Sequence, residues 1–411
     1  MNTTSPHLHT TTQDIQQILV AFNTLPSHQL AKEESFWQEV RNAYKTQGNF
    51  INLENGYYGV LPQCILEAQI RHTEQINQAN TFFMRTQKDD FLHTLKVKLA
   101  PHIGTSPDTI AFARNATDAL NIILQGIRLE KGDEIVATTQ DYPTALEAIE
   151  KKARGVGIVK KLIDLPLLPQ NDAQIVQIFA DAISPNTKLL LLTHIIHWTG
   201  QILPVKEICK MAHAKGVEVL VDSAHAFAQI DFKMDDIGCD YWIANLHKWL
   251  GAPLTAGILA IRKDKIHRVQ PLLASHQYQE DDIRKFENTS AIPMPIFMTI
   301  FDALLFHEAL GTANKSARLQ YMKNHWLKAV ADLPHVVINT PTAEGASCAI
   351  ANFNIVGKKG TEVAQILFDK FKIYSVGFDM PFVSGVRITP QFYNSLAELD
   401  QLVEAIKLLA P

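Results

Sequence analysis

One lysine stands just beyond one of the most apolar stretches of the chain. Lys248 follows Tyr241–Ala244, a run typical of a buried strand, within the segment ANLHKWLGAP (244–253). A lysine at the end of a strand ordinarily extends its charged end into water. Burial would instead lower the pKa of the amine and make it a nucleophile toward carbonyl carbon, as in Schiff-base lysines. Both readings are compatible with the position of Lys248 taken alone.

An aspartate ends a second apolar run, 26 residues before this lysine. Asp222 closes VEVLVD (217–222), where an aspartate is often only a turn or helix-capping residue. Pyridoxal phosphate (PLP) needs both groups, a lysine that bonds to its aldehyde and a carboxylate beside its pyridine nitrogen. The carboxylate keeps that nitrogen protonated, so that the ring accepts electrons from the α-carbon of a bound amine. Two adjacent strand ends would deliver Asp222 and Lys248 to one PLP molecule.

A helix start that suits a phosphate accompanies these two residues. The segment RNATDALNII (114–123) places a capping residue, Asn115 or Thr117, before an apolar helical face that begins at Leu120. Unpaired backbone N–H groups at such a helix start attract phosphate. Most capped helices bind no ligand, so the motif supports PLP only together with the lysine and the aspartate.

The elements that must position these residues follow from the hydrophobic pattern. Apolar spacing of i, i+3, i+4 and i+7 over 120–127 is typical of a helix. Strand–helix alternation predicts a parallel or mixed sheet with helices on both faces, whose ligands bind beyond the carboxyl ends of the strands. The predicted strands are the apolar runs 109–113, 134–139, 157–165, 188–195, 217–224, 240–247 and 256–263.

The length and the change of pattern along the chain predict two domains. A chain of 411 residues that is 46% hydrophobic exceeds the size of a single core. We expect a large PLP-binding domain over 66–295 and a smaller α+β domain over 296–411. Before them we expect an N-terminal extension (1–33) with a disordered tip, and a segment (34–65) that packs with the small domain.

Composition excludes several other classes of protein. The formal net charge is −4, so no basic excess attracts nucleic acid. No apolar run reaches the roughly 18 residues of a membrane span, and the N-terminus lacks a secretory core. Four scattered cysteines without a CxxC pair suggest neither zinc nor disulfides and favour a cytoplasmic location. His194 and His197 lack a third ligand nearby, so we expect no metal.

The whole sequence resembles the class V aminotransferase family of fold-type-I PLP-dependent enzymes, in particular its isopenicillin N epimerase-like members. The resemblance runs from about residue 50 to the C-terminus. Its most specific part is VDSAHAFAQIDFKMDDIGCDYWIANLHKWLGAP (221–253), and the supporting motifs are INLENGYYGVLP, ARNATDALN, DYPTALEA, THIIHWTGQILPV and GVRITPQFYNSLAELDQLVEAI. It implies an α/β fold with a mostly parallel seven-stranded sheet between helices, PLP as cofactor, and an amino-acid-like substrate.

The resemblance also implies catalytic roles for four residues. Lys248 would bond to the cofactor and later move protons at the substrate α-carbon, and Asp222 would pair with the pyridine nitrogen. His225 would approach the phenolic oxygen of the cofactor ring. His197 matches a position that faces the same oxygen or the substrate.

The binding residues are implied in the same way. Tyr142 would stack on the cofactor ring, and Arg387, in GVRITP, would hold the substrate α-carboxylate with its planar fork. The phosphate positions are Ala116, Thr117, Asn245 and His247. Many relatives carry a Gly-Thr pair that reaches the partner subunit's phosphate. KFENTSAIP (285–293) lacks that pair, which leaves Thr289 or Ser290 as a substitute.

The fold alone does not select the reaction. The resemblance favours an aminotransferase or an epimerase, and epimerisation needs a second acid, for which His197, Tyr57 and Tyr58 are candidates. Carbon–sulfur lysis by β-elimination is the alternative, and a non-catalytic PLP-fold sensor is less favoured. A cysteine desulfurase is not expected, because YSVGFDMPFVSGVR (374–387) lacks the nucleophilic cysteine that such enzymes carry before the substrate-binding arginine.

The resemblance predicts a homodimer with the active site at the interface. Sedimentation of the purified protein should give a dimer whose isologous contact completes each site. A monomer that keeps its full content of PLP and its activity would contradict this expectation. It would also remove any role of Thr289 or Ser290 across the interface.

Overall fold

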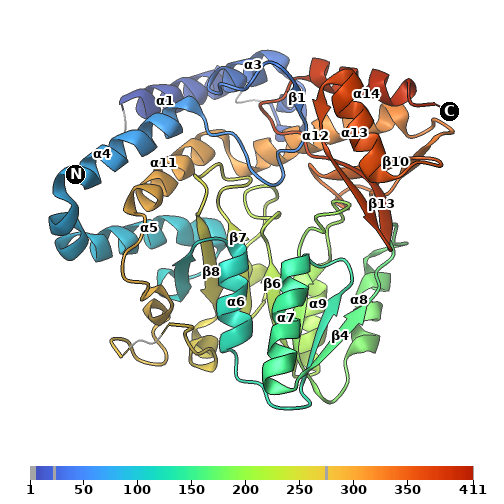
Figure 1. Cartoon of the computed structure of the whole chain (residues 1–411). Coiled ribbons are helices and arrows are strands. Elements are labelled where there is room, and N and C mark those ends of the chain that lie inside the picture. The colour runs from blue at the N-terminus through green and yellow to red at the C-terminus, as the bar shows by residue number, and fades with distance from the viewer. Residues whose placement is uncertain (1–5, 22–24, 274–275, 411) are drawn as a thin grey trace.

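A computed structural model describes residues 6–21, 25–273 and 276–410. At its centre is a seven-stranded sheet in the order β2-β8-β7-β6-β5-β3-β4 (Figure 1). Six of the strands run in the same direction, and β8 alone is antiparallel to both of its neighbours, β2 and β7. The mostly parallel sheet predicted from the sequence is thereby confirmed. The strands are β2 (Ile110–Ala113), β3 (Glu134–Thr138), β4 (Val159–Ile163), β5 (Thr187–Thr193), β6 (Glu218–Asp222), β7 (Tyr241–Asn245) and β8 (Gly257–Ile261).

The side chains of this sheet pack alternately into two hydrophobic clusters. On β6, Leu220 belongs to the cluster under α6 and α7, whereas Val221 belongs to the cluster under the helices of the opposite face. Strands buried on both faces read as continuous apolar runs, which explains why the sequence pattern predicted them. The covering helices are α6 (Ala116–Gly126) and α7 (Pro143–Val156) on one face, and α4 (Gln63–Thr86), α5 (Lys88–Ile103), α8 (Asp172–Ala182), α9 (Val205–Ala214) and α11 (Met294–Leu310) on the other.

A second, antiparallel sheet of four strands lies in the C-terminal part, in the order β12-β13-β10-β9. The N-terminal segment joins this part, because β1 (Ile51–Asn52) pairs in parallel with β11 (Ile373–Tyr374). The remaining elements are β9 (Val336–Ile338), β10 (Ala351–Ile355), β12 (Val376–Met380), β13 (Val383–Ile388), α12 (Thr312–Val330), α13 (Gly360–Phe371) and α14 (Leu396–Lys407). A capping box of Ser395 and Glu398 begins α14.

The N-terminal extension is helical where the structure describes it. It contains α1 (Pro6–Ala21) and α2 (Ser27–Leu30), followed by α3 (Glu34–Asn42). Helix α1 lies against α4 and α11. The tip that we expected to be disordered, residues 1–5, lies outside the described residues.

The boundary that we expected at residue 295 falls in the first turn of α11. The buried side chains of α11, such as Phe297 and Ile300, belong to the same cluster as one face of the large sheet. No single helix of the described ranges is long and apolar enough to cross a membrane, although α11 and α12, bent by 75°, meet the length and composition criteria as a pair.

Substitution of Gly257 by alanine should destabilise the protein. A Cβ atom at this first residue of β8 would lie 2.3 Å from the Cα of Asn115, at the start of α6. Because the obstacle is backbone, α6 must shift, and we expect a loss of about 1–3 kcal/mol in the free energy of unfolding. Denaturant titration measures this loss.

Gly155→Ala is the matched control, since that helical glycine has no atom within 4 Å of an added Cβ. It should be neutral or stabilising by up to about 1 kcal/mol. Equal stability of the two variants would show that the contact between β8 and α6 is not tight.

Candidate active site

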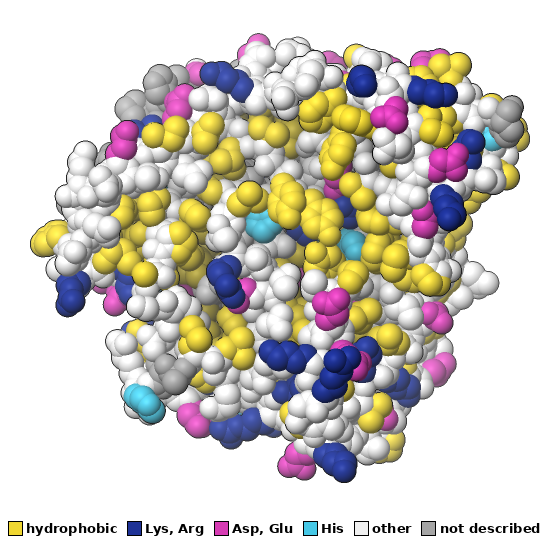
Figure 2. Space-filling model, viewed as in Figure 1, with side chains coloured by type: hydrophobic (Ala, Val, Ile, Leu, Met, Phe, Trp, Pro, Cys, Tyr) yellow, Lys and Arg dark blue, Asp and Glu magenta, His cyan; other side chains and the backbone are white. Residues whose placement is uncertain are grey.

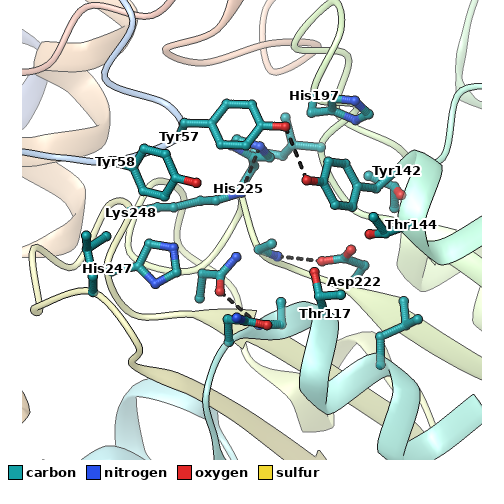
Figure 3. A pocket seen from close by; sticks show the side chains of 18 of the residues that line it. Tyr57, Tyr58, Thr117, Tyr142, Thr144, His197, Asp222, His225, His247 and Lys248 are labelled. Atoms are coloured by element: carbon teal, nitrogen blue, oxygen red, sulfur yellow. Dashed lines mark hydrogen bonds between the residues drawn. The ribbon is translucent and has the colours of Figure 1, made fainter. Parts of the chain in front are cut away.

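A cavity of about 290 Å³ opens at the carboxyl ends of β5, β6 and β7. Figure 2 shows hydrophobic and histidine side chains gathered across the middle of this face, with charged side chains mainly around them. The residues predicted from sequence that line the cavity are Tyr57, Tyr58, Ala116, Thr117, Tyr142, His197, Asp222, His225, Asn245, His247 and Lys248 (Figure 3). Arg387, Thr289 and Ser290 are not among its lining residues.

Lys248 points into this cavity from the loop that follows β7. Its Nζ lies 3.1 Å from Nε2 of His225 and 5.6 Å from the centre of the Tyr57 ring. The pKa of the Lys248 amine is lowered to about 8, mainly by burial and to a smaller extent by the charge of Arg387, while the charges of Asp222 and Glu54 oppose this shift. About a tenth of the amine is therefore uncharged at pH 7, far more than for a lysine in water, and the uncharged form is what a nucleophile or proton acceptor requires.

Asp222 ends β6, the strand beside β7 in the sheet. Its Oδ1 accepts a hydrogen bond of 2.8 Å from the backbone N–H of Ala224. Burial raises the pKa of Asp222 above its usual range, although that N–H and Lys248 favour the charged form. A buried carboxylate of this kind is well suited to hold a cation such as a protonated pyridine nitrogen.

Three histidines of the cavity are electrically neutral. Burial is the main cause that lowers the pKa of His197 and His225 far below the usual range, and that of His247 to about 4. The Nδ1 atom of each is buried and has no hydrogen-bond partner in the protein. Buried polar atoms in native proteins are almost always paired, so these three nitrogens indicate room for a polar ligand.

The start of α6 forms one side of the cavity. Asn115, and not Thr117, caps the helix, since its side chain accepts a hydrogen bond from the backbone N–H of Asp118. Asn245 accepts a bond of 2.8 Å from the N–H of Ala116, which ties the end of β7 to the helix. The helix start is therefore held against the strand ends, where its dipole favours an anion.

Two tyrosines meet above the cavity. The hydroxyl of Tyr57 donates to that of Tyr142 over 3.2 Å, and the Tyr142 ring meets the His197 ring edge-on at 5.3 Å. Tyr58 is exposed and stacks on His247 with ring centres 6.0 Å apart. Of the two neighbouring tyrosines, Tyr57 thus faces Lys248 and Tyr142, while Tyr58 forms the outer rim.

Arg387 lies behind Tyr57 and outside the cavity. Its guanidinium carbon is 5.1 Å from the centre of the Tyr57 ring, and the side chain has no exposed surface. It donates from Nε and Nη2 to the carboxylate of Glu54, over 3.1 and 2.5 Å, and from Nη1 to the carbonyl of His197. A substrate carboxylate can reach Arg387 only if Tyr57 or Glu54 gives way.

Thr289 and Ser290 belong to a different part of the surface. Thr289 lines a second cavity of about 1080 Å³, which Thr255 also borders, and both Thr289 and Ser290 are exposed. Within one chain these two residues are therefore not brought to Lys248. This placement leaves them free to act on another subunit, as the resemblance implies.

Sequence reasoning assigned no role to two acidic residues near the site. Glu54, within INLENG, pairs with Arg387. In the sequence, only its position as a charged residue next to Leu53, which is buried, could have indicated a role. Asp141 accepts hydrogen bonds from the Thr193 hydroxyl and the Thr138 N–H, and burial raises its pKa to about 6. Asp141 thereby anchors the turn that presents Tyr142.

The family model described as Aminotransferase class-V matches residues 61–380. This chain belongs to the class V aminotransferase family. The isopenicillin N epimerases of Streptomyces clavuligerus and Amycolatopsis lactamdurans are 26% and 27% identical to it, each over 91% of this chain and 98% of the relative. A probable cysteine desulfurase of Synechocystis is 24% identical over 87% of this chain and 90% of its own length.

Solved structures show the same fold. The apo cysteine desulfurase of Thermococcus onnurineus has a TM-score of 0.81 at 19% identity and covers 90% of this chain and 97% of its own. A mutant of the cystine C–S lyase C-DES, with glycine covalently linked to its PLP cofactor, has a TM-score of 0.80 at 23% identity and covers 89% and 98%. These likenesses establish the fold-type-I architecture of this chain.

PLP is the cofactor of this member of the class V aminotransferase family, and the cavity fits it. Its volume of about 290 Å³ lies just below the range of about 300–1,000 Å³ that is usual for small-molecule sites. Lys248 offers the amine, Asp222 the carboxylate and the start of α6 the N–H groups for a phosphate. The unpaired Nδ1 atoms of the histidines are further polar contacts for the ring and its substituents.

The pKa of Lys248 predicts how the cofactor-free protein reacts with acetic anhydride. Acetylation of Lys248, followed by peptide mass mapping, should reach half of its maximal rate near pH 8, because only the uncharged amine reacts. Surface lysines should require a pH above about 10. In Asp222→Asn the midpoint should fall below that of the wild type, since the lost negative charge favoured the ammonium form. A wild-type midpoint near 10 would contradict the role of burial.

Proposed function

We propose that this class V enzyme acts at the α-carbon of an amino-acid-like substrate, by epimerisation or by transamination. One observation carries the proposal: the Lys248 amine, with its lowered pKa, and the buried carboxylate of Asp222 share one cavity at the ends of neighbouring strands. The names of the two isopenicillin N epimerases, which match almost the full chain, support the choice of reaction.

When bound, PLP supplies a ring that withdraws electrons from the α-carbon of the substrate. We assign to the Lys248 amine the removal of the proton from that carbon. Asp222 holds a proton at the pyridine nitrogen by charge pairing in a buried environment. His225, whose Nε2 lies 3.1 Å from the Lys248 amine, orients that amine.

Epimerisation needs a proton donor on the face of the substrate that is opposite to Lys248. Of the three candidates, Tyr57 fits best. Burial and the contact with Tyr142 raise its pKa, so the phenol keeps its proton near neutral pH. His197 is neutral because of its burial, and Tyr58 lies on the exposed rim against His247. Arg387 beside the Tyr57 ring would stabilise the phenolate after the proton has left.

The remaining cofactor contacts are part of the same proposal. Ala116, Thr117, Asn245 and His247 would hold the phosphate and Tyr142 would cover the ring, which their position in the lining of the cavity supports. Two such chains would form a homodimer in which Thr289 or Ser290 of the partner subunit completes the phosphate site. The exposure of both residues supports this arrangement.

We propose that the chain is not a cysteine desulfurase, although its relatives include such enzymes. All four cysteines are buried. Burial raises the pKa of Cys209, Cys239 and Cys348, which disfavours the thiolate that attacks sulfur. Carbon–sulfur lysis by β-elimination needs no such thiolate and is the alternative reaction of the same site.

Asp222→Asn tests the mechanism. The exchange of the α-proton of amino acids with deuterium, followed in heavy water by mass spectrometry, should fall by at least about a hundredfold, which corresponds to roughly 2.7 kcal/mol of barrier. Cofactor content, measured by absorbance, should remain close to that of the wild type, because Lys248 and the phosphate contacts are unchanged. A panel of amino acids in the same assay identifies the substrate. The products distinguish the reactions, because epimerisation yields an epimer, transamination a keto acid and carbon–sulfur lysis sulfide.

Asp240→Asn is the matched control. Asp240 is a buried aspartate at the opposite end of β7, where it accepts from the backbone N–H of Val219 and pairs with Arg262. Its loss should lower stability and leave exchange per folded molecule unchanged. If Asp222→Asn exchanges the α-proton as fast as the wild type, Asp222 is a structural residue and the proposed mechanism is wrong.

A further inference from the structure

A buried ion pair occupies the arginine that is expected to hold the substrate. Glu54 and Arg387 are 333 residues apart in the sequence and meet through two hydrogen bonds, of 3.1 Å from Nε and 2.5 Å from Nη2. Neither side chain is appreciably exposed, at 4% for Glu54 and 0% for Arg387. The carboxylate of Glu54 thus binds this guanidinium in the bidentate manner of a substrate carboxylate.

The rest of the guanidinium is also enclosed. The rings of Tyr57 and Phe378 lie 5.1 and 5.2 Å from its central carbon, and Nη1 donates to the carbonyl of His197 over 2.9 Å. Of the five N–H groups of an arginine, three are therefore committed, and one hydrogen is left on each terminal nitrogen. An arriving carboxylate must replace Glu54 or share the cation with it.

We propose that Glu54 is a specificity-determining residue that competes with the substrate carboxylate for Arg387. This inference rests on the proposed function, in which Arg387 receives that carboxylate. The Glu54–Arg387 pair has no net charge, so a second carboxylate gains little attraction and is repelled by Glu54. The substrate carboxylate therefore contributes less to binding than it would if Arg387 were unpaired. The enzyme selects its substrate mainly by the other groups of that substrate.

The opposite role, in which Glu54 orients Arg387 for the substrate, is less compatible with the contacts. The carbonyl of His197 already holds the Nη1 nitrogen of the guanidinium, and the rings of Tyr57 and Phe378 hold its plane. Removing the charge of Glu54 would leave these three supports in place. The two roles predict opposite effects of Glu54→Gln, which makes them separable.

The test compares the two enantiomers of alanine with ethylamine, which lacks only their carboxylate. L-Alanine, D-alanine and ethylamine are titrated into the PLP-loaded protein, and the absorbance change of the cofactor gives a dissociation constant for each. The ratio of the constants for ethylamine and alanine measures what the carboxylate contributes. We expect a ratio below about tenfold in the wild type and a further increase of roughly ten- to hundredfold in Glu54→Gln, the range of one charge-assisted hydrogen bond.

Glu54→Asp, which keeps the charge, is the control and should retain a ratio close to that of the wild type. Arg387→Gln should bring the ratio close to one in the Glu54→Gln background, and to one or below where the unpaired Glu54 repels the carboxylate. Thermal denaturation establishes that each variant is folded. If Glu54→Gln does not fold, the ratio measured for the wild type is sufficient by itself. A wild-type ratio above about a hundredfold overturns the proposal that Glu54 competes with the substrate carboxylate.

The outcomes separate this inference from the proposed function. An unchanged or lower ratio in Glu54→Gln overturns the role of Glu54 while the proposed function stands, since both ligands still bind. If neither alanine nor ethylamine nor any other amino compound perturbs the cofactor, the proposed function fails and this inference fails with it.

Discussion

The burial of the Lys248 amine is the constraint on which the rest of the site depends. An ammonium ion taken out of water is destabilised, and the pKa of Lys248 falls to about 8 for that reason. The same burial keeps His197 and His225 uncharged, since a second cation beside the amine would be more costly still. Asp222 also lines this cavity, and its negative charge stabilises the protonated form of Lys248 or of a bound cofactor.

Charge balance also explains why two parts of the chain that are distant in sequence meet at this place. Arg387 on β13 would be an unpaired buried cation without Glu54, and breaking a buried pair is strongly destabilising. The pair fixes the segment after β1 against the C-terminal sheet, and this segment carries Tyr57 to the cavity. The arginine that we propose to bind the substrate carboxylate is thus already paired with a carboxylate of the chain itself.

The family and the fold leave the reaction open. Solved desulfurase and C–S lyase structures have the same architecture as this chain, at identities of 19–23%. In this chain all four cysteines are buried, and Tyr57 and Tyr58 line the cavity. In such a fold the reaction depends on the side chains around the site and not on the sheet.

The sequence by itself determined the seven strands, six of them because strands buried on both faces need long apolar runs. The seventh, the edge strand β4, is only partly buried and carries two lysines within its apolar run. The sequence also indicated Lys248 and Asp222, since polar residues that follow such runs lie at one edge of a parallel sheet. Only the tertiary structure decided that Asn115 caps α6, that Tyr57 and not Tyr58 faces Lys248, and that Glu54 pairs with Arg387. These contacts join residues up to 333 positions apart or choose between adjacent side chains, and local patterns carry no information about either. They arise because burial forces each polar group to find a partner wherever the folded chain supplies one.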